Sequence, residues 1–466
     1  MENDLKILHE ATLTLLKRTG VEVDSPRALK CLAGAGVRVD AASRRVYPEA
    51  RHVEEALATV PRQMTIHGRR PDRDRPVVLG GDHVNVVSGG GSVRVLTLDG
   101  RYEPATWEHL RQFNVLLEAL PNIHMHINQV DPVDQPGPGF YRRLAAEMLI
   151  GCTKPLCLQV GSVDDVRAMI EMGVASRGSL EALIEQPRFL VGWNSEPPLH
   201  ISEAVTDAFM AACEAGLPVS MGNYSMMGIT APITVAGAVV QLNAVQMVTI
   251  ILAQAARRGT PICYVSFAGS ADLRTLGENT STPHALQLVR LGAELGRFYG
   301  LPVYSNALTD ARGPDPQAAC ERAVIMQLCV EAGAHLIQGP TSHMDQMRLS
   351  SLVQALIDND IVGYVLAACR RPVVSAETLA LEAGHEVATE PRYAALKFAS
   401  HEHTVRHLRD EVWEPWAFDL DNFAAWDKAG RVSVVERAAA KAREILATHR
   451  PEPLPADIAD AIRRPC

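Results

Sequence analysis

The feature that most constrains this chain is a regular alternation of short apolar runs with longer helical segments, from about residue 105 to residue 371. Neighbouring parallel strands need a crossover connection, usually a helix, so this alternation predicts a parallel sheet. One further strand, near 84–95 or 361–366, would close an eight-stranded (β/α)₈ barrel. An open doubly wound sheet is the competing architecture. The seven runs are 123–129, 155–160, 189–194, 218–223, 261–267, 302–306 and 335–338.

A nucleotide-binding version of the open sheet is disfavoured, because no GxGxxG or Walker motif follows the first strand. The glycine run Gly89-Gly90-Gly91-Ser92 lies in a stretch with alternating apolar residues and an Asp-Gly turn. We expect it to form the turn of a β-hairpin and not a phosphate-binding loop.

The chain divides into three expected parts. Residues 1–104 are predicted to form helices and β-hairpins that pack on the barrel, since an amphipathic leucine stripe is followed by alternating, glycine-rich sequence. Residues 105–371 form the barrel core, and residues 372–466 form a mostly helical C-terminal segment. Asp315 is predicted to cap a helix that begins at Pro316.

Charge and cysteine content exclude some functions and indicate a compartment. The formal net charge is −9 and no Lys/Arg-rich run occurs, which argues against nucleic-acid binding. The nine cysteines are dispersed and form no CxxC pair, as expected for thiols in a reducing cytoplasm. The N-terminus does not resemble a signal peptide. The apolar stretch 229–256 is interrupted by Gln and Asn, so we expect a buried barrel helix and a cytoplasmic protein.

The predicted strand ends carry amides, hydroxyls and aromatic rings, with few charges. Active sites of (β/α)₈ barrels lie at the carboxyl ends of the strands. Aromatic faces attract quaternary ammonium groups by about 0.5–2 kcal/mol each. Each ring by itself also fits ordinary core packing, so both interpretations stay open. The rings concerned are Trp193, Tyr224, Tyr264, Phe267 and Tyr304.

His124 and His126 form an HxH pair on one face of a predicted strand. Such a pair binds metal in some hydrolytic barrels, but that chemistry needs further His and Asp ligands at later strand ends, and these are missing. We therefore predict no metal site and keep a metal-dependent hydrolase as an alternative. Lys154 precedes a strand and is interpreted as a surface or helix-end charge.

The segment LPVYSNALTDARGPDPQAACER, residues 301–322, resembles the trimethylamine methyltransferase family, as do SPRALKCLAGAGVRVD, GRYEPAT, APITVAGAVVQLNAVQ, FYGLP, ALIDNDIV and HEHTVRHLRDEVWEPW. The matches keep the same order over nearly the whole chain. The resemblance, to a family related to methanogenesis, implies a (β/α)₈ barrel that moves a methyl group from an amine to Co(I) of a separate corrinoid protein. It further implies that no cofactor is bound directly and that the enzyme is a homo-oligomer.

The main departure from the family pattern is Leu308. Archaeal trimethylamine enzymes carry pyrrolysine at the matching position, and no pyrrolysine occurs here. The resemblance therefore points to the branch that includes glycine betaine methyltransferases, whose quaternary amines already contain a good leaving group. Such a protein has only to position the methyl group. A non-catalytic amine-binding protein with the same fold remains an alternative.

The resemblance and the strand-end pattern together nominate the site residues. Leu308, Asp310 and Glu321 are the expected catalytic residues. The expected substrate-binding residues are Trp193, Asn194, Asn223, Tyr224, Tyr264, Phe267, Tyr304, Asn306, Gln338 and His343.

Overall fold

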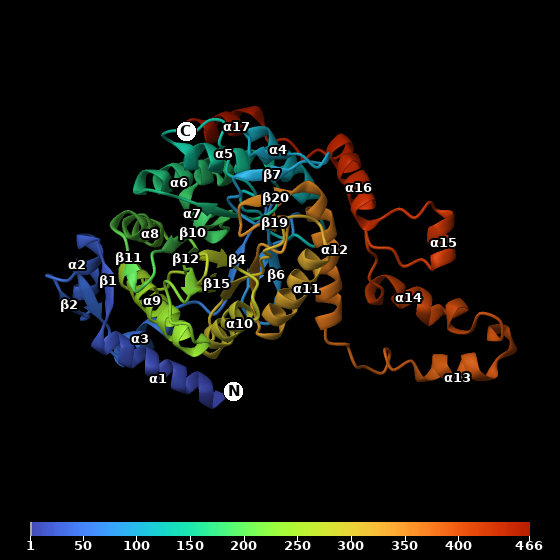
Figure 1. Ribbon diagram of the computed structural model, residues 1–466, viewed down its shortest axis with the longest axis horizontal. Coiled ribbons are helices and arrows are strands. Elements are labelled where there is room, and N and C mark those ends of the chain that lie inside the picture. Colours follow the sequence, from blue (N-terminus) through green and yellow to red (C-terminus); the bar gives the residue numbers. More distant parts are fainter. Residues whose placement is uncertain (1) are drawn as a thin grey trace.

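Parallel strands form the centre of the molecule in a computed structural model that describes residues 2–466. Seven strands are hydrogen-bonded in the order β6-β18-β17-β14-β12-β10-β9, and helices surround them (Figure 1). All of the neighbouring pairs are parallel. The strands are β6 (Asn85–Val87), β9 (Leu156–Gln159), β10 (Phe189–Ser195), β12 (Val219–Asn223), β14 (Ile262–Ser266), β17 (Val303–Asn306) and β18 (Leu336–Gln338).

The segment 123–130 closes this sheet into a barrel. Met125 bridges to Val87 of β6, and His126 bridges to Leu156 of β9, both in the parallel sense. The predicted (β/α)₈ barrel is thereby confirmed, and residues 123–130 take the place of its eighth strand. Strand β6 lies within the predicted range 84–95 and before the expected boundary at residue 105. The other predicted range, 361–366, is wrong because it lies inside helix α12 (Leu352–Cys369).

The outer helices begin where the sequence provides caps. Asp315 accepts a hydrogen bond from Ala318 N at 2.9 Å, and Pro316 opens the helix, as predicted. Two helices, α9 and α12, are long and apolar enough to cross a membrane, but 78% and 72% of their apolar windows are buried inside the fold. They are core helices of the barrel. The barrel helices are α4 (Trp107–Ala119), α5 (Phe140–Gly151), α6 (Val163–Arg177), α7 (Leu180–Glu185), α8 (Glu203–Ala215), α9 (Val235–Ala256), α10 (Pro283–Phe298), α11 (Pro316–Glu331) and α12.

The N-terminal part covers one side of the barrel and its floor, the end at which the strands begin. Helices α1 (Glu2–Arg18), α2 (Pro26–Gly34) and α3 (Ala50–Leu57) contact α9. Strands β1 (Val21–Val23), β2 (Arg38–Asp40), β3 (Arg45–Tyr47) and β11 (His200–Ile201) form a small sheet. The hairpin of β4 (Met64–Ile66) and β5 (Val77–Leu79) places its apolar side chains in the barrel interior.

Several short strands lie beyond the carboxyl ends of the barrel strands. The Gly89–Ser92 run directly follows β6, so the expectation that it forms a hairpin turn is wrong. A Cβ atom on Gly89 would lie 2.7 Å from Cβ of His343, so the backbone passes close to that ring. The strands here are β7 (Arg94–Leu96), β8 (Tyr102–Pro104), β19 (His343–Met344) and β20 (Leu349–Ser351) in one sheet, and β13 (Ser225–Met227), β15 (Ala268–Asp272) and β16 (Gly277–Asn279) in another.

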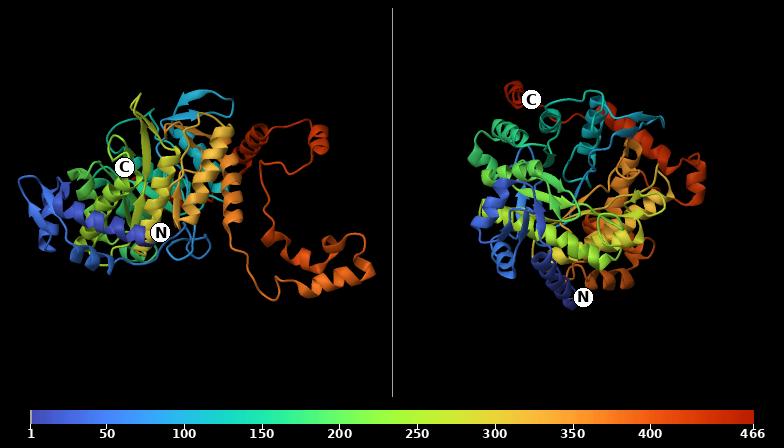
Figure 2. Two further views of the ribbon diagram at one scale, coloured as in Figure 1. Left: turned by 60° about the horizontal axis from the view of Figure 1, so that its bottom comes forward. Right: turned by 60° about the vertical axis from the view of Figure 1, so that its left-hand side comes forward.

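The regular elements that follow α12 are helices. Helix α16 (Val434–Thr448) packs on α12 and α4, and α17 (Ala456–Arg463) packs on α5 and α6. Residues 372–432, which we call the arm, project from the side of the barrel instead (Figures 1 and 2). The arm contains α13 (Leu381–Thr389), the short 3₁₀ helices η1 (Pro391–Tyr393) and η2 (Lys397–Ser400), α14 (Glu402–Glu411) and α15 (Phe423–Lys428).

Candidate active site

Strand alternation separates the nominated residues into two groups, because successive side chains point to opposite faces of a strand. Tyr304 lies in the apolar cluster of the barrel interior, and Phe267 packs beside it. The two rings meet edge to face, with centroids 4.9 Å apart. The Tyr304 hydroxyl donates to Oε1 of Gln338 at 2.5 Å. An aromatic pair and an amide thus share the carboxyl end of the interior.

Two asparagines extend this group. Asn194 is exposed, and a Cβ atom on Gly222 would lie 2.3 Å from its Oδ1, so glycine makes room for the amide. The same Cβ would lie 3.3 Å from the Phe267 ring. Asn306 is buried. Its amide accepts a hydrogen bond from Ala268 N and donates one to the Ala268 carbonyl oxygen, each at 3.4 Å. These amides adjoin the aromatic pair at the strand ends.

Three other nominated side chains face the helices and do not line the interior. The Tyr264 hydroxyl donates to Oδ1 of Asn243 on α9 at 3.1 Å. Trp193 packs edge to face on Phe209 of α8, with centroids 5.6 Å apart. Asn223 donates to the Ser195 hydroxyl at 2.9 Å and is fully buried. Each sits at a strand position of the outward parity, and these three expectations do not hold.

Tyr224 lies next to a carboxyl group that the sequence did not single out. Burial raises the pKa of Glu278 on β16, while the neighbouring Tyr224 phenol favours its ionised form. A Cβ atom on Gly269 would lie 2.4 Å from the Tyr224 hydroxyl, so β15 passes directly over the ring. Glu278 was missed because it follows no predicted barrel strand.

Leu308 and Asp310 belong to the loop after β17. Leu308 is only 2% exposed, and a Cβ atom on Gly339 would lie 2.5 Å from its Cδ2. The Asp310 carboxylate accepts from Thr280 N at 2.9 Å, from the Thr280 hydroxyl at 2.8 Å and from Ser281 N at 3.0 Å. It therefore ties the Leu308 loop to the segment that precedes α10.

Glu321 on α11 holds the same loop from its other side. One carboxylate oxygen accepts from the Thr309 hydroxyl at 2.5 Å and from Asp310 N at 2.9 Å. The other oxygen accepts from Gln317 at 2.7 Å. Both nominated acids thus accept hydrogen bonds from this chain's own donors and hold the loop that carries Leu308. We call Asp310 and Glu321, with the groups they bind, the loop clasp.

His343 is buried at the end of the barrel beside Gly89. Burial lowers its pKa to about 4, so the ring is neutral at pH 7. Nε2 is 3.0 Å from the carbonyl oxygen of Met347, which can only accept, so Nε2 carries the proton. Among the described residues, Nδ1 has no hydrogen-bond partner. His343 therefore offers an acceptor at Nδ1, while its N–H is engaged by Met347.

A buried ion pair, also missed from the sequence, supports this end of the barrel. Arg322 Nε lies 3.1 Å from Asp358, and both side chains are fully buried. Arg322 also donates to the carbonyl oxygens of Gly339 and His343. The pair fixes the chain between β18 and β19, against which Leu308 packs. No motif in the sequence reveals a pairing between two helices.

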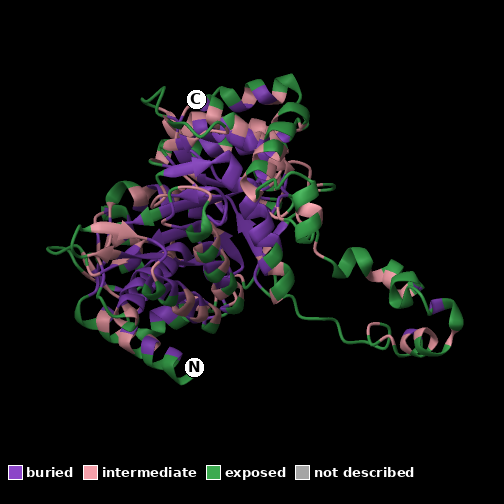
Figure 3. Ribbon diagram, turned by 45° about the vertical axis from the view of Figure 1, so that its right-hand side comes forward, coloured by how far each residue is buried: buried purple, intermediate pink, exposed green. Residues whose placement is uncertain are grey.

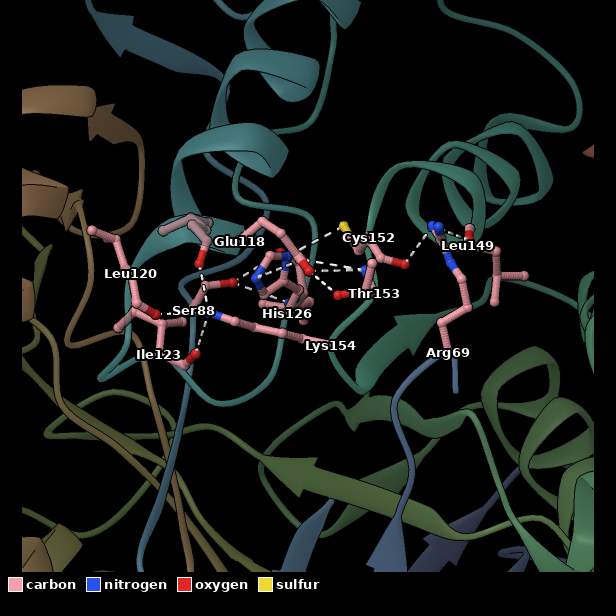
Figure 4. Close-up of polar contacts among 12 residues, drawn as sticks. Arg69, Ser88, Glu118, Leu120, Ile123, His126, Leu149, Cys152, Thr153 and Lys154 are labelled. Carbon is pink, nitrogen blue, oxygen red and sulfur yellow. Dashed lines mark hydrogen bonds and ion pairs between the residues drawn. The ribbon is translucent and has the colours of Figure 1, made fainter. Parts of the chain in front are cut away.

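The two histidines of the HxH pair lie between the barrel and its helices. His124 Nδ1 accepts a hydrogen bond from Val86 N at 3.0 Å. His126 Nδ1 lies 3.3 Å from Sγ of Cys152, and its Nε2 lies 3.9 Å from the Glu118 carboxylate (Figure 4). Since neither ring faces the interior, the pair does not form a metal site at the strand ends, and the hydrolase alternative loses its support.

Glu118, His126 and Cys152 come close enough together to suggest a cation site, but their surroundings are positively charged. Lys154 donates to the carbonyls of Leu117, Leu120 and Ile123 at 2.7–2.8 Å (Figure 4). Buried Arg188 and partly buried Arg69 both donate to the Cys152 carbonyl at 2.8 Å. A divalent ion would meet three cations and one carboxylate, so the cluster does not suit a metal.

The same cations have a structural explanation. The last carbonyls of a helix lack partners and carry partial negative charge, which favours cations at that end. Lys154 binds the carbonyls that end α4, and Arg69 binds those that end α5. Lys154 is therefore a charge at the end of a helix, which is one of the two interpretations that its sequence position allowed. The surface interpretation is wrong, because the Lys154 ammonium binds three carbonyls inside the fold.

Comparison with known proteins identifies relatives over the full length. The family model described as trimethylamine methyltransferase (MTTB) matches residues 1–464. The trimethylamine methyltransferase MttB of Desulfitobacterium hafniense (strain DSM 10664 / DCB-2) is 28% identical, over 99% of this chain and 92% of its own length. The glycine betaine methyltransferase of Desulfitobacterium hafniense (strain Y51) is 26% identical, over 98% of this chain and 94% of its own length.

Among solved structures, the monomethylamine methyltransferase MtmB of Methanosarcina barkeri has a similar fold, with a TM-score of 0.52. The similarity covers 93% of this chain and 96% of that chain, at 10% sequence identity. At that identity the comparison supports the fold alone.

Proposed function

Because the chain belongs to the trimethylamine methyltransferase family, whose members are amine methyltransferases, we propose that it moves a methyl group from a quaternary amine to Co(I) of a corrinoid on a separate protein. The proposed substrate is a betaine similar to glycine betaine, on which one relative is named to act. In this reaction the methyl–nitrogen bond breaks, its electron pair stays on nitrogen as the tertiary amine leaves, and cobalt provides the pair for the new bond.

The observation that carries this proposal is Leu308. By resemblance it occupies the position of pyrrolysine in the archaeal trimethylamine enzymes, and it is a buried aliphatic side chain packed on Gly339. Leucine cannot form a covalent adduct with an amine. A neutral tertiary amine would have to leave as an anion and is a poorer donor than a quaternary ammonium, which releases a neutral amine directly. The loop is therefore suited to a substrate that needs orientation and no activation.

The residues at the strand ends supply what such a cation requires. The Phe267 and Tyr304 rings present aromatic faces and edges, and each ring stabilises a desolvated ammonium by about 0.5–2 kcal/mol. Glu278 adds a carboxylate beside Tyr224 and near Asp310 of the Leu308 loop. The Asn194 side chain carries an amide N–H₂ that is free to donate to the carboxylate of a betaine. Leu308 contributes apolar surface against which the methyl groups pack.

The bound corrinoid supplies the nucleophile, and it comes with the partner protein; this chain's residues only orient the amine. We also propose that the enzyme works in the cytoplasm as a homo-oligomer, with residues 1–104 and 372–466 as accessory parts of the barrel. The two mostly buried apolar helices are consistent with that location.

A panel of amines tests the proposal. The purified enzyme is mixed with a reduced corrinoid protein and, separately, with glycine betaine, proline betaine, carnitine or trimethylamine. The visible spectrum is followed for the change from Co(I) to the methylated corrinoid. We expect methylation with at least one quaternary amine and none with trimethylamine. Methylation with trimethylamine alone contradicts the role given to Leu308. Saturable amine binding without any cobalt methylation supports a non-catalytic binding protein instead.

A further inference from the structure

Carboxamide side chains dominate the carboxyl end of the barrel interior. Successive side chains on a strand alternate between its two faces, so the apolar interior cluster shows which positions point inward. We call the last inward position, on or just after each barrel strand, the amide layer. It consists of two glycines, Phe267 and five amides, and none of these residues carries a charge. The amides are Gln129, Gln159, Asn194, Asn306 and Gln338.

Three of these amides are held by the protein itself. Gln129 donates from Nε2 to the Ser350 hydroxyl at 2.9 Å. Gln338 accepts from the Tyr304 hydroxyl, and Asn306 is bonded to the backbone of a neighbouring strand. These contacts fix the orientation of the three amides, which therefore belong to the wall of the site.

Gln159 and Asn194 differ from the other three. Within residues 2–466, no donor or acceptor of the chain pairs with either amide. The two lie on the adjacent strands β9 and β10, and Gln159 is level with Gly192, two residues before Asn194. The barrel strands form the buried centre of the molecule (Figure 3), yet Asn194 is exposed and Gln159 is half-buried. Since both face inward, solvent reaches the interior at this point, and both amides are available to a ligand.

The free amides lie close to the aromatic pair of the candidate site. Strand β12 separates β10 from β14, after which Phe267 follows. Neighbouring strands are about 4.8 Å apart, so the backbones of Asn194 and Phe267 are about 10 Å apart. A Cβ atom on Gly222 of β12 would touch both side chains, at 2.3 Å from Asn194 Oδ1 and 3.3 Å from the Phe267 ring. One small molecule therefore spans from the rings to the free amides.

The chemistry of the two groups indicates which end of a ligand each receives. A quaternary nitrogen has no N–H and cannot donate to an amide oxygen, so it pairs with the rings. The amide N–H₂ groups are then left for the other end of the ligand, where a carboxylate accepts stronger hydrogen bonds than a neutral group does. A layer without charge also suits a ligand whose own charges balance, because burying an uncompensated charge is costly.

We propose that Gln159 acts with Asn194 to bind the carboxylate of the substrate, and that Gln159 selects zwitterionic quaternary amines over quaternary amines without a carboxylate. The inference rests on the proposed function for the kind of substrate. It concerns binding to the enzyme alone, however, and that step is measured without a corrinoid protein.

Isothermal titration calorimetry of the full chain, with glycine betaine and separately with choline, tests the proposal. Choline has the same trimethylammonium group but carries a hydroxyl in place of the carboxylate. Gln159→Glu keeps the size of the side chain and adds a negative charge, whereas Gln159→Leu removes the donor without adding charge. Gln63→Glu is the matched control, because Gln63 is exposed and directly precedes β4. Thermal unfolding followed by circular dichroism confirms that each variant is folded.

We expect the unmodified chain and Gln63→Glu to bind glycine betaine more tightly than choline, by about tenfold or more. Gln159→Leu should weaken the binding of glycine betaine by about tenfold and leave choline binding unchanged. Gln159→Glu should weaken glycine betaine further and strengthen choline. Opposite shifts for the two ligands cannot arise from a loss of stability, so they separate recognition from a structural role.

Three results overturn the proposal: an unmodified chain that does not bind glycine betaine, equal affinity for the two ligands, or unchanged glycine betaine binding in both Gln159 variants. The corrinoid methylation assay on the same proteins separates this inference from the proposed function. Methylation from glycine betaine that is unaffected in both variants removes Gln159 and leaves the function intact. The expected binding shifts without any methylation support Gln159 as the selecting residue and remove the function.

Discussion

A substitution in the loop clasp tests whether Asp310 positions the Leu308 loop without supporting the stability of the whole fold. In Asp310→Asn, one carboxylate oxygen becomes an N–H₂ group of the same size. Asp310 uses both of its oxygens: Thr280 N lies 2.9 Å from each of them, and Ser281 N lies 3.0 Å from Oδ2. Asparagine keeps one acceptor and turns a donor toward a backbone N–H.

The size of the effect follows from these contacts. A hydrogen bond to a charged group contributes about 1.5–3 kcal/mol, and the variant loses at least one together with the charge. A loss of about 2–3 kcal/mol corresponds to a factor of about 30–150 in the population of the positioned loop. We expect the rate of methyl transfer to fall by between about 10- and 100-fold. The barrel itself keeps its contacts, so the unfolding temperature should change by no more than about 3 °C.

The assay pairs the initial rate of corrinoid methylation with calorimetric unfolding. Asp315→Asn is the control, because Asp315 caps α11 and asparagine is an equally good cap, so both quantities should stay unchanged. An unaltered rate in Asp310→Asn refutes the positioning role. A rate loss matched by an equally large loss of global stability would show that Asp310 supports the fold and not the loop.

Three further outcomes are expected. Tyr304→Phe should lower methyl transfer because it removes the bond to Gln338, whereas Tyr264→Phe should lower only stability, by about 1 kcal/mol; a larger rate effect at Tyr264 would contradict its outward orientation. Arg322→Met leaves Asp358 unpaired in the interior and should cost about 3–5 kcal/mol in the free energy of unfolding, measured in urea; a loss below 1 kcal/mol, roughly a surface-pair value, would refute this. Burial lowers the pKa of His126, His335 and His343 to about 4, so these rings take up protons on unfolding between pH 6.5 and 4, and the free energy of unfolding should fall as the pH is lowered through that range. Burial raises the pKa of Asp131 and Asp358 to about 6, and these two carboxyl groups offset part of the loss because they bind protons more tightly in the folded protein. A urea midpoint at pH 5 equal to that at pH 7 would contradict this balance.

The barrel was predictable because its signal is repeated along the chain. Each apolar run with its helix points to the same architecture, and the helix that begins at Pro316 has its cap, Asp315, directly before it. The exception is instructive. The first strand, β6, is only three residues long, and a glycine run follows it, so its sequence looked like a hairpin.

The candidate site was only partly predictable, because residues one position apart on a strand face opposite ways. Tyr264 and Phe267 differ by three positions, and only Phe267 adjoins the interior. Placing them required the register of β14, which a short apolar run does not define. Glu278 and the Arg322–Asp358 pair depend on contacts between elements far apart in the sequence, and no local pattern encodes such contacts.

The filled floor of the barrel has a kinetic consequence. The β4–β5 hairpin packs its apolar side chains into the interior at the end where the strands begin, so that end of the barrel is filled, and in the proposed reaction the opposite, carboxyl end is the opening. In the proposed reaction the amine and the methyl acceptor share that opening. The amine has to enter before the acceptor protein covers it, and the demethylated product leaves only after the acceptor departs. Steady-state kinetics should therefore show a compulsory order, with excess acceptor protein inhibiting at low amine concentration.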